Sequence, residues 1–329
     1  MTNFYDGRRV LVTGATGFIG TNLIARLVQL GAVVTGTIHN SPPQREEPTV
    51  RYVRGDLTNM ADCLEACRDV EYVFMCAANS SGAAVMARRP LTHLTPNVVM
   101  NAQMLAAAYE CGVKKFCFIS SNTVYPLTDY AVKEEAAEFD FYEKYFVVGW
   151  MKRFSEVMCD MYSEKISRTM STVVVRPGNL YGPFDKFDPA ESKVVAALIR
   201  RAVERQNPFV VWGDGNDVKD FLFIDDFVSG LISVFSQVER VGPVNIASGT
   251  PVTVRDLLDI VIHEAGHNHA DVVFDETMPT MIPRRLIDIS KIKSLTGWGP
   301  KVSLSDGVRE TVRWYREVGL KRKFDGAAL

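Results

Sequence analysis

The first half of the chain alternates between short apolar runs and segments of helical periodicity. Residues 9–13, 33–38 and 116–120 are rich in β-branched or aromatic side chains, as buried strands are. Between them, apolar residues recur every three or four positions, as in 23–30 and 97–110. This alternation predicts right-handed crossovers and a parallel sheet with helices on both faces. We therefore predict an α/β fold with a Rossmann-type, doubly wound parallel sheet.

The pattern changes after Pro177. Prolines and the loop 213–215 separate shorter elements, and helices are predicted near 254–265 and 304–316. These features predict a smaller lobe, mostly C-terminal, whose elements interleave with the sheet. The predicted domains are 1–178 with roughly 220–247 returning to it, and a second lobe made of 179–219 and 248–329.

Three glycines directly follow the first predicted strand. Gly14, Gly17 and Gly20 lie between that strand and the next helical segment. Glycines let the backbone turn sharply and approach a pyrophosphate, whose charge the helix N-terminus and its N–H groups attract. In this strand–turn–helix position, the spacing predicts dinucleotide binding. The residues expected around the cofactor phosphates are Gly14, Thr16, Gly17, Phe18, Ile19 and Gly20.

The spacing Gly-x-x-Gly-x-x-Gly resembles that of the short-chain dehydrogenase/reductase superfamily, and the resemblance extends over nearly the whole chain. It implies a nicotinamide dinucleotide as cofactor, with an active site beside it. The positions that match are the adenine-binding Asp56 and Leu57, the cofactor-side Ala77 and Ala78, the structural Asn97 and the active-site pair Ser120 and Ser121.

The end of the second predicted strand bears on the choice of nicotinamide dinucleotide. A carboxylate there would bind the ribose 2′-hydroxyl of NAD and repel the 2′-phosphate of NADP. The stretch instead reads Ile38-His39-Asn40, with Arg45 just beyond. The sequence therefore favours NADP, with His39 and Asn40 beside the cofactor, and leaves open a site that accepts either NADP or NAD.

Downstream motifs are similar to those of the extended branch of this superfamily, the nucleotide-sugar epimerases, dehydratases and reductases. Residues 176–183 resemble one signature of that branch and residues 211–226 another. A nucleoside diphosphate sugar brings two phosphates, so cationic side chains have to converge on it from separate segments. The resemblance implies a nucleotide-sugar substrate held by Asn179, Lys193, Trp212, Lys219, Arg284 and Arg285.

Within this branch, residues 181–201 resemble the GDP-L-fucose synthases, so a GDP-sugar is the first expectation. The resemblance also implies a homodimer, because the helices matching 97–110 and 149–165 pair into a four-helix bundle in the family. Such helices can also use their apolar stripes only to cover the sheet, and the sequence leaves that alternative open. The stripes include Met104, Ala108, Met151, Phe154 and Met158.

The chain matches only part of the set of residues that transfer protons in this family. In this superfamily the lysine of a Tyr-x-x-x-Lys pair lowers the tyrosine pKa, and the tyrosine exchanges a proton with the sugar. Lys152 matches the lysine, but Val148 stands at the tyrosine position. The Cys and His that serve the fucose synthases as acid and base correspond to Thr123 and Lys193. The residues expected to carry chemistry are Ser121, Thr123, Tyr145, Lys152 and Lys193.

Three interpretations of this departure stay open. The chain is an enzyme whose acid or base comes from Tyr145, Lys193 or the substrate, or a binding or sensor protein that kept both pockets, or an inactivated variant. Tyr145 is a candidate because it lies three residues before Val148, on the same face of a continued helix.

Composition narrows the class of protein further. A formal net charge of -2 over 329 residues favours neither nucleic acid nor a membrane surface as a partner. No apolar stretch reaches the about 18 residues of a membrane helix, and the N-terminus has no secretory pattern. The cysteines form no Cys-x-x-Cys pair, and although His263, Glu264 and His267 have the spacing of a His-Glu-x-x-His site, no further metal-ligand motif accompanies them. We expect a cytoplasmic protein with reduced thiols and no metal.

Overall fold

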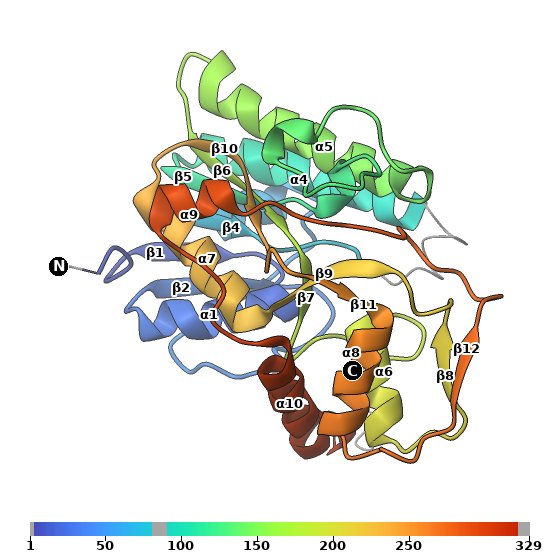
Figure 1. Cartoon of the computed structure of the whole chain (residues 1–329). Coiled ribbons are helices and arrows are strands. Elements are labelled where there is room, and N and C mark those ends of the chain that lie inside the picture. Colours follow the sequence, from blue (N-terminus) through green and yellow to red (C-terminus); the bar gives the residue numbers. More distant parts are fainter. Residues whose placement is uncertain (1–2, 81–90, 322–329) are drawn as a thin grey trace.

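A seven-stranded sheet forms the centre of the molecule in the computed structural model, which describes residues 3–80 and 91–321. Its strand order is β10-β6-β5-β4-β1-β2-β3, and every neighbouring pair is parallel (Figure 1). The strands are β1 (Arg9–Val12), β2 (Val33–Ile38), β3 (Arg51–Arg54), β4 (Tyr72–Met75), β5 (Lys115–Ile119), β6 (Ser171–Pro177) and β10 (Val241–Ile246). The predicted doubly wound, Rossmann-type sheet is confirmed.

Helices cover both faces of this sheet (Figure 1). On one face, α4 (Leu91–Glu110) packs between α2 (Met60–Cys67) and α5 (Phe146–Asp160). On the other face, α7 (Ile224–Gln237) packs between α1 (Phe18–Gln29) and α9 (Ser290–Thr296). Successive β1 residues point to opposite faces, so Leu11 joins one buried cluster while Val10 and Val12 join the other. None of the helices within the described residues is long and apolar enough to cross a membrane.

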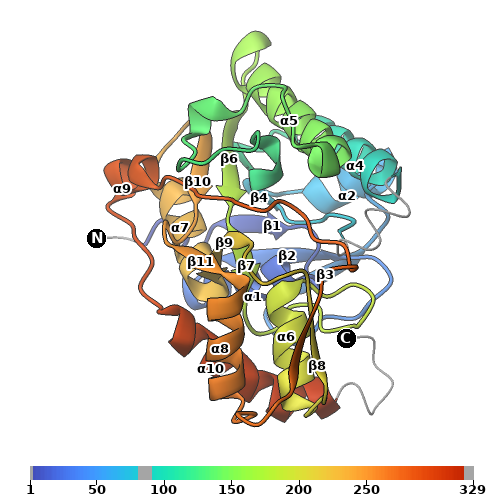
Figure 2. The same cartoon turned by 45° about the vertical axis from the view of Figure 1, so that its right-hand side comes forward.

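A smaller lobe is built from segments that follow Pro177, while α7, β10 and α9 return to the central sheet (Figure 2). It holds a three-stranded sheet of order β11-β9-β7 and a two-stranded sheet of β12 and β8. Strand β10 pairs with β6 in the main sheet, whereas β9 pairs within the lobe; the domain boundaries themselves stay a prediction. The lobe's elements are β7 (Asn179–Tyr181), α6 (Val194–Val203), β8 (Phe209–Trp212), β9 (Val218–Phe223), β11 (Pro251–Thr253), α8 (Val254–Glu264), β12 (Val272–Asp275) and α10 (Leu304–Trp314).

Two helices differ at their ends from the sequence-based expectation. Helix α4 begins at Leu91 rather than near Asn97 and contains Pro96, a residue whose missing N–H normally ends a helix. The Asn97 amide donates to the carbonyl of His93 at 2.6 Å, which ties the first turn of the helix to the rest. Helix α5 ends at Asp160 and continues as a π-helical turn, Met161–Lys165.

A buried ion pair joins α5 to the central sheet. Arg176 on β6 donates from Nε and Nη2 to the two carboxylate oxygens of Glu156 on α5, at 2.9 and 2.7 Å. Ser120, just after β5, donates its hydroxyl to the same carboxylate at 2.5 Å. Arg153, one turn earlier on α5, donates to it at 3.3 Å. The carboxylate is therefore bound by three side chains from α5 and two neighbouring strands.

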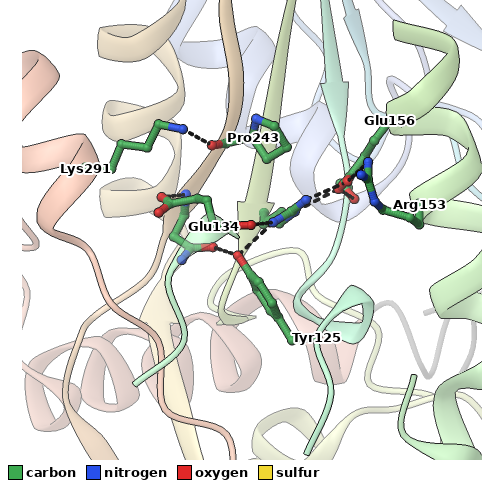
Figure 3. Close-up of polar contacts among 9 residues, drawn as sticks. Tyr125, Glu134, Arg153, Glu156, Pro243 and Lys291 are labelled. Carbon is green, nitrogen blue, oxygen red and sulfur yellow. Dashed lines mark hydrogen bonds and ion pairs between the residues drawn. The ribbon is translucent and has the colours of Figure 1, made fainter. Parts of the chain in front are cut away.

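The same guanidinium extends this network to the edge strand β10 (Figure 3). Arg176 Nη1 donates to the Tyr125 hydroxyl at 3.0 Å and to the carbonyl of Glu134 at 2.8 Å. Tyr125 in turn donates to the side-chain oxygen of Asn245 on β10 at 2.6 Å. The backbone amide of Asn245 donates to the Glu134 carboxylate at 2.7 Å. A continuous set of hydrogen bonds thus runs through the carboxyl-terminal part of β6.

Candidate active site and cofactor loop

The glycine loop between β1 and α1 is closely packed. Gly14 has φ +63°, and a Cβ at this position would lie 2.8 Å from the Cα of Ala77. A Cβ on Gly20 would lie 2.2 Å from the Gly14 carbonyl oxygen. Both positions therefore require glycine for the fold itself. Gly17 precedes α1, whose first N–H groups at Phe18, Ile19 and Gly20 have no acceptor within the helix.

Threonines bring the ends of three strands together around this loop. The Thr13 hydroxyl accepts the amides of Cys76 and Ala77 at 3.1 and 3.0 Å, which holds the segment after β4 against β1. Thr37 at the end of β2 accepts the Gly14 amide through its hydroxyl at 3.0 Å and the Ala15 amide through its carbonyl at 2.9 Å. The carboxyl ends of β1, β2 and β4 thus meet where a doubly wound sheet binds its ligand.

The residues expected around the cofactor's adenosine lie on this edge. His39 and Asn40 are exposed directly after β2, and Arg54 donates to the His39 carbonyl. Asp56 is exposed, and hydrogen bonds from the amide and hydroxyl of Thr58 hold its pKa below the usual value. The Leu57 side chain is buried in the core, so a cofactor contact there would involve its backbone.

Asn97 is bound through its side chain to the backbone of the segment that follows β4. Its side-chain oxygen accepts the Asn79 amide at 2.8 Å, and its amide donates to the Asn79 carbonyl at 2.9 Å. Both bonds fix the backbone just after the half-buried Ala77 and the exposed Ala78, next to the glycine loop. Helix α4 therefore sets the position of the cofactor-side loop.

Lys152, Ser121 and Thr123 come together beside the end of β5. The Lys152 ammonium donates to the Ile119 carbonyl at 2.8 Å, and burial lowers its pKa to about 8. Ser121 Oγ accepts the Thr123 amide at 3.2 Å, while the buried Thr123 hydroxyl has no hydrogen-bond partner within the described chain. A Cβ on Gly149 would lie 2.9 Å from the Thr123 carbonyl oxygen, so α5 approaches this segment closely through its glycine.

Tyr145 is oriented differently from the sequence-based expectation. It ends a 3-10 turn, Glu143–Tyr145, rather than continuing α5 backwards. Burial raises the pKa of its phenol to about 12, a hydrogen bond with the Ile282 backbone opposes that rise, and Arg285 and Asp217 are charged neighbours. The titratable neighbours of the Lys152 ammonium are instead Glu156, Cys76 and Lys193. Lys193 is exposed at the start of α6, and it is a charged neighbour of Lys152 although the two residues lie far apart in the sequence.

The cations expected to bind a nucleotide sugar have different surroundings. Lys219 is buried, with its ammonium bound by the Asp217 carboxylate at 3.0 Å and by the Ile282 carbonyl. Arg285 is fully buried and donates to the carbonyls of Pro126 and Tyr125 at 2.8 and 3.0 Å. Arg284 is exposed and lines an open cavity of about 510 Å³ together with the segment 126–130. Of the two arginines, Arg284 is the one available to a ligand.

Asn179 and Trp212 lie in the framework of the lobe. The Asn179 amide donates to the Asp220 carbonyl at 3.0 Å, which links β7 to β9. Trp212 is half-buried at the end of β8, with the Arg201 guanidinium 5.9 Å from its ring centroid. The ligand contacts of both residues stay a prediction. No group of three His, Cys, Asp or Glu side chains within residues 3–80 and 91–321 is arranged to hold a metal ion.

Two contacts that the sequence analysis missed connect the cofactor loop to the smaller lobe. The Gln44 amide donates to the Thr16 carbonyl at 3.0 Å and to the Phe184 carbonyl at 3.3 Å. Asn22 on α1 donates to the Pro183 carbonyl at 3.2 Å. Neither residue belongs to a motif. The Pro183 and Phe184 carbonyls lie 161 and 140 positions away in the sequence, so no local pattern indicates these bonds.

Comparison with known proteins gives concordant results. The model of the NAD dependent epimerase/dehydratase family matches residues 10–247. The chain is 31% identical over 323 residues to a probable GDP-L-fucose synthase 1 of Oryza sativa subsp. japonica, covering 94% of this chain and 93% of that protein. The structure is similar to the epimerase Mth375 of Methanothermobacter thermautotrophicus, with a TM-score of 0.88, 27% identity and coverage of 98% and 97% of the two chains. It is also similar to the NAD complex of a UDP-glucose 4-epimerase from Thermus thermophilus, with a TM-score of 0.84, 25% identity and coverage of 94% and 99%.

We expect Gly17→Val to abolish binding of NADP and NAD while the protein stays folded. A branched side chain would stand where the pyrophosphate approaches α1, yet a Cβ at residue 17 meets the Gly14 carbonyl oxygen at 3.2 Å and no other described atom within 4 Å. Gly14→Val is a poorer test, because its φ and its contact with Ala77 also threaten the fold. Gly242→Val, in open space on β10, is the control. Calorimetric titration that finds unchanged affinity for Gly17→Val would refute the cofactor loop.

We expect substitutions of the two neighbouring arginines to have different effects, one on ligand affinity and the other on thermal stability. Arg284→Ala should weaken the binding of a nucleoside diphosphate by about 1.5–3 kcal/mol, the usual range for a hydrogen bond to a charged group, and leave the melting temperature unchanged. Arg285→Ala should lower the melting temperature, because two buried carbonyls lose their donor. Calorimetry with GDP, UDP and dTDP and a thermal melt measure both. Equal loss of GDP and NADP binding in Arg284→Ala would show that the ligand site is misplaced.

Proposed function

We propose that this chain, which belongs to the NAD-dependent epimerase/dehydratase family, is an epimerase or 4-ketoreductase of a nucleoside diphosphate hexose. The observation that carries the proposal is that Ser121, Thr123 and Lys152 assemble beside a glycine loop whose close packing admits no side chain at Gly14 or Gly20. Family membership establishes the general kind of protein. The choice of cofactor, sugar nucleotide and proton donor is our inference.

NADP is the cofactor that the local charges favour. His39 and Asn40, the exposed residues directly after β2, carry no carboxylate, and Arg54 donates to the His39 carbonyl. Arg45 is half-exposed and pairs with Glu47 at 2.8 Å, so its charge is partly compensated. The family is described as NAD-dependent, and the Thermus epimerase was solved with NAD, which keeps NAD as the second choice. The residues that would hold either dinucleotide are those of the glycine loop, the β2 end and the Asn97-anchored segment.

A GDP-hexose is the substrate that we propose first. The probable fucose synthase from rice carries a GDP-sugar in its name, and the resemblance extends along nearly the whole of both chains. Arg284 offers the exposed cation for the diphosphate, and the start of α6 adds Lys193. Binding of UDP in preference to GDP would replace this part of the proposal without affecting the cofactor loop.

The chain's residues can divide the chemistry among them. A bound nicotinamide would supply or accept a hydride at the sugar. The Lys152 ammonium, with its pKa lowered to about 8 by burial, can orient the nicotinamide ribose and keep a positive charge near it. Ser121 can donate a hydrogen bond from its hydroxyl to the reacting sugar oxygen, since its oxygen already accepts the Thr123 amide. The unpartnered Thr123 hydroxyl suits a second sugar oxygen, because an unsatisfied buried hydroxyl costs free energy.

One observation favours a second function. Val148, on the first turn of α5 and one turn before Lys152, has no group that can exchange a proton, and the Tyr145 phenol is hydrogen-bonded to the Ile282 backbone. A positioned general acid or base contributes typically about 10²–10⁴-fold to a rate. A protein that binds both ligands as a sensor, without turnover, is the alternative that this site supports. Incubation with NADPH and GDP-, UDP- and dTDP-hexoses, followed at 340 nm and by product mass, separates the two.

We expect Val148→Tyr to raise turnover of a 4-keto or 4-hydroxy nucleotide sugar at least about tenfold, because it supplies the missing proton donor one turn from Lys152. Val147→Tyr, the neighbouring residue on the same helix, is the matched control and should give no gain. Tyr145→Phe should be nearly silent, since its phenol serves the Ile282 backbone. If Val148→Tyr changes nothing and Lys193→Ala abolishes turnover, proton transfer belongs to Lys193 and the interpretation of a weakened reductase is wrong.

We further propose that two copies of the chain pair through α5. Met104, Ala108 and Met151 of the expected stripe are buried within one copy, Met158 is half-buried, and Phe154 is exposed. The exposed apolar row is instead Phe146, Trp150 and Phe154, spaced by four residues, with Phe139 packed 5.1 Å from the Trp150 ring centroid. Light scattering at micromolar concentration should give a dimer mass, and Phe154→Asp should give a monomer. A monomer mass for the unchanged protein would contradict the pairing.

A further inference from the structure

The loop of residues 182–193 connects β7 to α6 and lies between the two lobes. Asn22 and Gln44, from the cofactor side, donate to its Pro183 and Phe184 carbonyls. From the other side, the Trp314 ring at the end of α10 packs 5.1 Å from the Phe184 ring centroid. The start of the loop is therefore fixed against the cofactor loop and against α10, and its end carries Lys193.

The backbone of this loop adopts conformations that need compensation. Gly182 has φ +147°, and a Cβ there would lie 2.5 Å from an Ile224 side-chain carbon. Phe184 has φ +70°, a left-handed conformation that bulky residues rarely adopt and that tends to be retained at functional sites. This turn places the next residue, Asp185, inside the protein with 7% of its surface exposed.

The Asp185 carboxylate is only half satisfied. Its Oδ1 accepts the amide of Lys186 at 2.8 Å, whereas the buried Oδ2 has no hydrogen-bond partner in the described parts of the chain. Burial raises the pKa of this carboxyl, and the charges of Lys193 and Lys186 oppose that rise. A buried, unpaired carboxylate oxygen is costly, so the protein has reason to provide it with a cation.

Two cations are charged neighbours of this carboxylate, Lys193 and Lys186, and the second already has hydrogen-bond partners. Lys186 donates to the Glu191 carboxylate at 2.7 Å and to the Ser80 carbonyl at 3.0 Å. Lys193 has no hydrogen bond or ion pair from its ammonium among residues 3–80 and 91–321. Its charge also lowers the pKa of Lys152. Lys193 is therefore a charged neighbour of both the unsatisfied Asp185 carboxylate and Lys152.

We propose that Asp185 is a positioning residue for Lys193: its buried Oδ2 receives the Lys193 ammonium and aims the remaining N–H groups at the sugar nucleotide beside Lys152. The anchored turn fixes the direction from which Lys193 reaches the sugar. This inference rests on the proposed function and takes the case in which Lys193 supplies the proton that Val148 cannot supply. It adds that a loop of the smaller lobe, and not α5, orients the proton-bearing group.

The test compares Asp185→Asn with Asp188→Asn, three residues further along the loop. The control removes the same charge from a carboxylate that accepts the Ala190 amide. With the GDP-hexose that turns over, Asp185→Asn should lower kcat about tenfold and change KM less than about twofold. In a Lys193→Met background, Asp185→Asn should have no further effect, because residues that act through one another are not additive. An equal fall in both backgrounds overturns the proposal, as does an equal fall with Asp188→Asn.

A second measurement needs no turnover and so separates this inference from the proposed function. The rate at which acetic anhydride acylates Lys193 in the presence of GDP and NADP, read by mass spectrometry, should rise in Asp185→Asn and stay unchanged in Asp188→Asn. A faster rate with no turnover in any variant supports the Asp185–Lys193 contact and defeats the enzymatic function. An unchanged rate defeats the contact even where the enzyme is active. Should Asp185→Asn fail to fold, Asp185→Glu, which displaces the carboxylate by one methylene, replaces it with the same expected results.

Discussion

The ion pair between Glu156 and Arg176 fixes the geometry on which the rest of the site depends. Their side chains are 1% and 2% exposed, so desolvation is costly and only complete satisfaction of both groups compensates it. Ser120 and Arg153 donate further hydrogen bonds to the carboxylate. The Tyr125 hydroxyl and the Glu134 carbonyl accept the remaining hydrogen bonds of the guanidinium. Lys152 lies one helical turn before Glu156, on the same face of α5. The ion pair that holds Glu156 at β6 therefore also holds Lys152 next to the end of β5, where its ammonium donates to the Ile119 carbonyl.

Local sequence was sufficient for the elements and contacts that depend on neighbouring residues. The glycine spacing after β1 predicted a sharp turn, in which the structure leaves no room for a side chain at Gly14 or Gly20, and the strand–helix alternation predicted that the sheet is parallel. Asn97 was assigned its structural role from the resemblance alone, and its two bonds to Asn79 span only 18 residues. Where a contact is decided within one strand–turn–helix unit, residue type and spacing determine it.

Contacts between distant segments could not be read in this way. Arg284 and Arg285 are adjacent and equivalent in sequence, yet only Arg285 reaches the carbonyls of Tyr125 and Pro126, at sequence separations of 160 and 159. Tyr145 looked equivalent to a residue one turn before Val148, but the 3-10 turn directs its phenol to the Ile282 backbone. The surroundings of each charged group depend on how the smaller lobe packs on the sheet, which no motif encodes.

The same rigidity limits where a substitute for the missing tyrosine can come from. Because the Glu156–Arg176 pair and the close approach of Gly149 to Thr123 hold α5 in place, the helix cannot slide to bring Tyr145 to the position of Val148. A replacement proton donor has to arrive from an element that is not part of this clamp. The loop of residues 182–193 meets that condition, since it is anchored to the cofactor loop through Gln44 and ends in a lysine near the Lys152 charge. In the proposed enzyme, a proton donor that replaces the missing tyrosine therefore has to come from the smaller lobe.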